Sequence, residues 1–170
     1  YSPTDFCIEV SWTRRIDNSS GCKSEKVTGN SIYKLVDKVE YADKKLSENG
    51  IIIHLENNSK LDPLFSDPEE VKLMFEKNPN VEFLLDVAHI DNYDHLKAMM
   101  KIKKPKILHI ADRHLEVIHE HLPIGQGNID YNYSFKNVLS DFDGRIILEI
   151  VQSSKDIIES KLKIEEYYRK

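Results

Sequence analysis

The sequence has few cysteines, no long apolar run and no surplus of positive charge, and each absence excludes a class of protein. Two cysteines in 170 residues cannot form the dense disulfide framework of a small secreted domain. Cys7 and Cys22 could pair, but we expect them to stay reduced in a cytoplasmic protein. No apolar stretch approaches the roughly 18 residues that a membrane span requires, and no signal peptide is visible.

The formal net charge of −5 gives the chain no general attraction to nucleic acid, which would require a local basic patch. The lysines that do cluster are Lys101, Lys103, Lys104 and Lys106. We interpret them as solvent-exposed residues that lead into the next strand, rather than as a phosphate contact. A content of 40% hydrophobic and 31% charged residues is typical of a globular protein. We therefore expect one domain, residues 1–170, with a small-molecule partner.

Four short apolar runs each carry an acidic or histidine residue at or near their end. The runs IIIHLE, VEFLLD, KILH and RIILE end in Glu56, Asp86, His109 and Glu149. Such runs are typical of buried parallel strands, which occur in α/β barrels and in open doubly wound sheets. Because the carboxyl ends of parallel strands share one face, these four side chains should converge. Three carboxylates and one imidazole predict a divalent-metal site.

The apolar pattern predicts five strands that alternate with helices. The strands are expected near 6–11, 51–55, 81–85, 106–110 and 145–150. The helices are expected at 31–49, from a cap at Ser66 or Asp67 onwards, at 91–100, at 132–142 and from 154 onwards. A polar stretch before Asn30 is expected to be a lid or a poorly ordered loop. A complete barrel has eight strands, so we expect the carboxyl-terminal part of a barrel. Further amino-terminal residues or a second copy of the chain would close its open side, and an open α/β sheet is the last alternative.

The order of these motifs, with HEHLPIGQGNIDY from His119 to Tyr131, resembles the xylose-isomerase-like TIM barrel superfamily. This superfamily includes sugar and sugar-phosphate isomerases and epimerases, and the family 2 abasic-site endonucleases of the endonuclease IV type. The matching pieces are LEN at 55–57, Asp86 with His89, His109 with Asp112, the HEHLPIGQG loop, and ILE ending at Glu149. The resemblance covers roughly residues 50 to 152.

The resemblance implies a metal-dependent isomerase or epimerase that acts on a sugar or sugar phosphate. One divalent ion (Mn, Mg, Co or Zn) would be held by Glu56, Asp86, His109 and Glu149. Glu56 and Glu149 would also be the catalytic pair that moves the proton next to a carbonyl. His89, Arg113 and His121 are expected to contact the substrate, although Arg113 could instead pair with Glu116.

Departures from the family pattern place the abasic-site endonuclease second among the possible functions. The acidic residue that the endonucleases have two positions before the loop histidine is here His119, which removes one of their zinc ligands. We expect His119 not to replace it. The glutamate between the two loop glycines is here Gln126, and the first strand ends without the endonuclease histidine. A non-catalytic member of the superfamily is the third alternative, and a homo-oligomer is possible.

Overall fold

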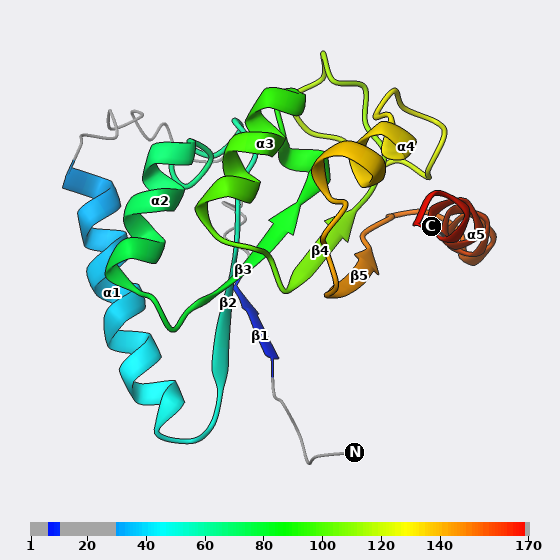
Figure 1. The fold of residues 1–170 in the computed structure, drawn as a ribbon. Helices are drawn as coiled ribbons and strands as arrows, with labels where there is room; N and C mark the ends of the chain where they lie inside the picture. Colours follow the sequence, from blue (N-terminus) through cyan, green and yellow to red (C-terminus); the bar gives the residue numbers. More distant parts are fainter. Residues whose placement is uncertain (1–6, 11–29, 169–170) are drawn as a thin grey trace, which may run out of the picture.

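The computed structural model describes residues 7–10 and 30–168 (Figure 1). The loop expected before Asn30 and Cys22, the second cysteine of the possible pair, lie within residues 11–29, outside the described part. No helix among the described residues combines the length and apolarity needed to span a membrane.

Five parallel strands form one sheet. They are β1 (Cys7–Val10), β2 (Ile52–Glu56), β3 (Glu82–Asp86), β4 (Ile107–Ile110) and β5 (Arg145–Leu148). Each strand pairs with the next one along the chain, in the order β1-β2-β3-β4-β5. A doubly wound sheet reverses its strand order at a switch point, whereas a barrel does not. The described strands are therefore part of a (β/α) barrel.

Helices α1 (Asn30–Ser47), α2 (Pro68–Lys77) and α3 (Tyr93–Ile102) lie together on the outer side of the sheet, and α5 (Ser154–Tyr168) lies beyond β5 (Figure 1). Asp67 caps α2 by accepting a hydrogen bond from the Glu69 amide at 2.8 Å, and Pro68 occupies the first turn. Asn92 caps α3 in the same way. The chain leaves α1 through Gly50, whose φ of 71° favours glycine.

The two faces of the sheet differ in how completely they are covered. On the outer face, Phe83 and Leu85 are buried in the core under the helices. On the inner face, Ile52 and Ile147 are 44% and 42% exposed. Complete barrels fill this inner space with side chains. The exposure therefore agrees with an incomplete barrel.

Two predicted elements differ from the structure. The helix expected at 132–142 is a single turn, α4 (Tyr131–Tyr133), followed by a π-helix, η2 (Ser134–Val138), in which the Leu139 amide donates to the Ser134 carbonyl at 2.8 Å. A π-helix is wider than an α-helix. In the turn directly before it, the Tyr131 hydroxyl donates a buried hydrogen bond to the Ala111 carbonyl. Strand β5 ends at Leu148 rather than Ile150, because Ile150 packs against Ala88 and Ala111 instead of continuing the sheet.

Candidate active site

The four strand-end residues converge at the carboxyl edge of the sheet, as predicted. Glu56 and Asp86 are the last residues of β2 and β3, His109 lies in β4, and Glu149 directly follows β5. One potential ligand atom from each lies within 4.8 Å of the others. The Glu149 amide donates to the Ile110 carbonyl at 3.1 Å, which keeps Glu149 beside β4 after β5 has ended.

The imidazole of His109 lies between two glutamates. Its Nδ1 is 3.0 Å from Glu56 Oε1 and 2.9 Å from Glu149 Oε2. The hydrogen bond with His109 holds the pKa of Glu149 below its usual range, so this carboxylate is ionised at neutral pH. The two glutamates differ in exposure, because the Glu56 side chain is 6% exposed and the Glu149 side chain 41%. Glu149 is thus the one open to solvent.

Asp86 is the most deeply buried carboxylate of the group. The buried Asn57 side chain fixes its backbone, accepting from the Asp86 amide at 2.8 Å and donating to the Asp86 carbonyl at 3.2 Å. Asp86 Oδ1 accepts from the Ala88 amide at 2.6 Å, whereas buried Oδ2 accepts no hydrogen bond from any described residue. Burial, with the charges of Glu56 and Glu149, raises the pKa of Asp86 well above its usual range.

This donor set fits a divalent cation. Buried carboxylates are costly unless a positive charge or hydrogen bonds compensate them. The three carboxylates of this group face a single imidazole, and Asp86 Oδ2 has no hydrogen-bond donor among the described residues. Mixed carboxylate and imidazole ligands suit Mn, Mg, Co or Zn.

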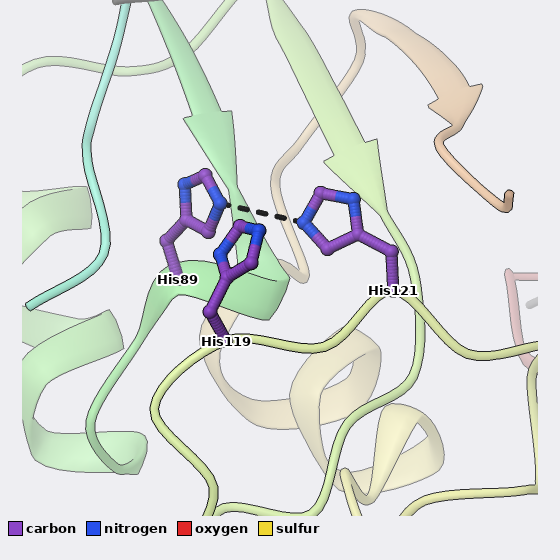
Figure 2. A group of neighbouring side chains, drawn as sticks. All are labelled: His89, His119 and His121. Carbon is purple, nitrogen blue, oxygen red and sulfur yellow. Dashed lines mark hydrogen bonds between the residues drawn. The ribbon is translucent and has the colours of Figure 1, made fainter. Parts of the chain in front are cut away.

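Three histidines lie close to one another near the strand ends (Figure 2). His89 comes from the short 3-10 helix η1 (Val87–His89) after β3, while His119 and His121 come from the loop after β4. His89 Nε2 is 3.2 Å from Asp86 Oδ2, and His121 Nδ1 is 3.7 Å from Glu149 Oε1. Burial lowers the pKa of all three imidazoles, which favours their neutral forms.

The carboxylate of Asp112 shapes the loop that carries these histidines. Its Oδ1 accepts from the Arg113 and Ile129 amides at 2.8 and 3.2 Å, and its Oδ2 accepts from the Gly125 amide at 2.7 Å. An antiparallel bridge joins Asp112 to Leu122. Asp112 therefore joins the start of the loop to its later residues through hydrogen bonds of one buried side chain.

Arg113 holds two loops together rather than pairing with Glu116. Its guanidinium donates to the Ile118 carbonyl at 2.7 Å and to the Ile90 carbonyl. Glu116 instead accepts from Asn128 at 3.1 Å. The residue is only 3% exposed. Its expected contact with substrate stays a prediction, and its contacts in the structure hold the loops that follow β3 and β4.

Two residues near the site had no assigned role in the sequence interpretation. Asn57 belongs to the LEN motif, and its position directly after a strand-end glutamate is the pattern that could have indicated its buried hydrogen bonds to Asp86. His119 was expected not to be a ligand, yet the structure groups its ring with those of His89 and His121. The spacing His-Glu-His could have indicated this, since residues two apart can share one side of an extended loop.

A family model described as xylose isomerase-like TIM barrel matches residues 18–168. No curated protein sequence matches the chain.

Solved structures with similar folds include a D-tagatose 3-epimerase-like protein (TM-score 0.66, 21% identity, 95% of this chain and 60% of that one). The 3-keto-D-glucoside 4-epimerase YcjR from E. coli is also similar (TM-score 0.63, 15% identity, 95% and 62%). A third is the probable 3-DHS dehydratase AsbF from Bacillus anthracis (TM-score 0.65, 13% identity, 84% and 58%). The chain spans about 60% of the length of these proteins, and the identities are low enough that the likeness shows the fold alone.

Proposed function

Because the chain belongs to the xylose isomerase-like TIM barrel family, we propose that its site isomerises or epimerises a sugar with the help of one divalent metal ion. The observation that carries this proposal is the position of Glu56 and Glu149, whose carboxylates both lie about 3 Å from the same His109 nitrogen. Two of the similar structures are described as a sugar epimerase or an epimerase-like protein, which supports the same reaction class.

The metal ligands would be Glu56, Asp86, His109 and Glu149. A bound divalent ion would polarise the substrate carbonyl. Within the site, Asn57 holds Asp86 in place through its two buried hydrogen bonds. The loop histidines His89 and His121 would face the substrate hydroxyls.

The two glutamates would share the proton transfer. Glu149 is ionised at neutral pH and open to solvent, so it would remove the proton next to the carbonyl. Glu56, which is buried and lies beside the same His109 nitrogen, would return a proton to the opposite face or to the neighbouring carbon. The first outcome is epimerisation and the second is isomerisation.

Solvent exchange of the substrate's α-proton tests this proposal. In D₂O with saturating Mn²⁺, the protein should incorporate deuterium into one member of a panel of ketoses, measured by NMR. Glu149→Gln should lower the exchange rate by about 10²-fold or more, because the amide cannot carry the proton. The metal content of the variant, measured by mass spectrometry, separates proton transfer from ligation.

The matched control is Glu159→Gln, which changes an exposed glutamate of α5 that pairs with Lys155. It should exchange protons at the wild-type rate. Unchanged exchange in a metal-loaded Glu149→Gln protein would remove Glu149 from the mechanism. A wild-type protein that cleaves abasic DNA and exchanges no sugar proton would contradict the proposed function itself.

A further inference from the structure

A cavity of about 410 Å³ lies between α1, the end of β2, the loop after β2 and the start of the core under α2. Its wall is mostly apolar and includes Leu35, Val39, Leu55, Leu64, Phe65 and Met74. Closely packed protein interiors leave few voids larger than a water molecule. A mostly apolar cavity of this size is instead typical of a site that takes a small molecule.

Two lysines of α1 bring positive charge to this cavity. Lys34 and Lys38 are one helical turn apart, so they lie on the same side of α1, and both line the cavity while remaining exposed to solvent. Neither ammonium group forms an ion pair within the part of the chain that the structure describes. Two acidic residues also line the cavity. The carboxylate of Glu56 is bonded to His109, and Asp62 belongs to the loop after β2.

The loop wall of the cavity holds a strained residue. Phe65 has a φ of 64°, a left-handed conformation that a bulky side chain rarely adopts. Its amide donates to Glu70 Oε2 at 2.7 Å, and its carbonyl accepts from the Asn58 amide at 2.9 Å. Strain of this kind persists only where the surroundings enforce it, and it is concentrated at ligand sites.

A second hydrogen bond to the same loop fixes the neighbouring wall position. The Asn58 side chain donates to the Leu64 carbonyl at 2.8 Å. The ring of Phe65, only 4% exposed, also packs against Phe75 with the ring centroids 6.1 Å apart. This wall is therefore formed by contacts within the protein and is in place before any ligand binds, which lowers the entropic cost of binding.

We propose that this cavity binds an amphipathic organic anion, an apolar chain or ring that carries one acidic group. The apolar part would lie against Val39, Leu55 and Phe65, and the acidic group would face Lys34 and Lys38. Complementary charge selects an anion over a neutral molecule of the same size. The site goes beyond the proposed function, because it requires neither the metal ion nor the sugar.

Titration calorimetry with decanoate tests this site in the absence of metal. The buffer contains EDTA, so that the carboxylate of the probe cannot bind through a metal ion. We expect one decanoate per chain. Octanoate should bind about tenfold more weakly, because two fewer methylene groups are removed from water.

Two variants separate the charged end of the site from its apolar interior. Lys34→Gln combined with Lys38→Gln should raise the Kd for decanoate about tenfold, as expected for the loss of two ion pairs near the surface. Leu35→Trp should raise it by about tenfold or more, because the larger side chain takes up space that the alkyl chain needs.

Each variant has a matched control. Lys45→Gln removes an exposed charge of the same helix away from the cavity, and Leu162→Trp enlarges an exposed residue of α5. Both should bind decanoate with the wild-type Kd. Urea unfolding of all four variants shows whether a loss of binding reflects a loss of folded protein.

A wild type that does not bind decanoate would overturn the proposal and would show that the cavity is filled within the protein itself. Unchanged binding in Leu35→Trp would also overturn it, because the ligand would then lie elsewhere. Unchanged binding in the double lysine variant would refute the selection of an anion. A protein that binds decanoate yet exchanges no sugar proton refutes only the enzymatic proposal.

Discussion

At the scale of single residues, the strand-end side chains were predictable and the loop side chains were not. Glu56, Asp86, His109 and Glu149 each end a short apolar run, and parallel strands bring such ends together whatever their separation in the sequence. The contacts of Arg113 depend instead on where two loops place their carbonyl groups. Nothing in the local sequence specifies that, so the sequence left a pair with Glu116 open as an alternative, whereas in the structure Glu116 accepts a hydrogen bond from Asn128.

Arg113→Lys should destabilise the protein by about 1.5–3 kcal/mol, the usual range for a hydrogen bond made by a charged group. A single ammonium cannot reproduce the guanidinium's planar, forked bonds to the Ile90 and Ile118 carbonyls. Urea unfolding measures the loss. Arg145→Lys, at an exposed position of β5, is the control and should leave stability nearly unchanged. A fully stable Arg113→Lys protein would show that these bonds contribute little.

At the scale of elements, the starts of helices were predicted to within about two residues where capping residues marked them. Asp67 with Pro68, and Asn92, cap α2 and α3 as expected. The π-helix η2 was not predictable from the local sequence. Tyr131 of α4, the turn before it in the chain, donates a hydrogen bond to the carbonyl of Ala111, directly after β4, and this contact between distant segments accompanies the i+5 hydrogen bond of η2. The end of β5 was likewise decided by a contact from outside the strand, between Ile150 and the two alanines.

The HEHLPIGQG loop packs so closely on the backbone of Arg113 that only glycine fits at position 127. A Cβ added to Gly127 would lie 2.5 Å from Arg113 backbone atoms. Gly127→Ala should therefore cost about 1–3 kcal/mol of stability, as overpacking does. It should also speed amide exchange of Asn128, which donates to the Arg113 carbonyl at 2.9 Å. Gln126→Ala, at the exposed neighbouring position, should change neither measurement; equal effects of both variants would contradict this account.

At the scale of the whole molecule, the number and sequential order of the strands were predictable from the five apolar runs, and with them the partial barrel. The sequence pattern could not show how far the inner face is covered, because that depends on neighbours outside the described strands. Ile52 and Ile147 are exposed on the same face as the candidate metal ligands. Closure of this face by further strands or by a second copy stays a prediction.

Metal binding should stabilise the whole molecule, and increasingly so as the pH rises. Burial, with the charges of Glu56 and Glu149, raises the pKa of Asp86 in the folded state. Its contribution to stability is therefore fully present below about pH 4, the range of an unfolded aspartate, and is lost as pH rises through the folded pKa. A divalent ion binds the deprotonated carboxylate of Asp86. Protons compete with the ion for this carboxylate less as the pH rises, so the ion binds more tightly at higher pH.

The measurement is the difference in melting temperature between protein with saturating Mn²⁺ and protein in EDTA, from pH 5 to 8. An ion present at about 100 times its Kd adds roughly 2.7 kcal/mol, which corresponds to about 5–10 °C for a domain of this size. The difference should grow with pH in the wild type and be small and flat in Asp86→Asn, which lacks the titrating carboxylate. Asp141→Asn, at an exposed position, should behave like the wild type. A difference that stays constant across this pH range in the wild type would show that Asp86 does not link protons to metal binding.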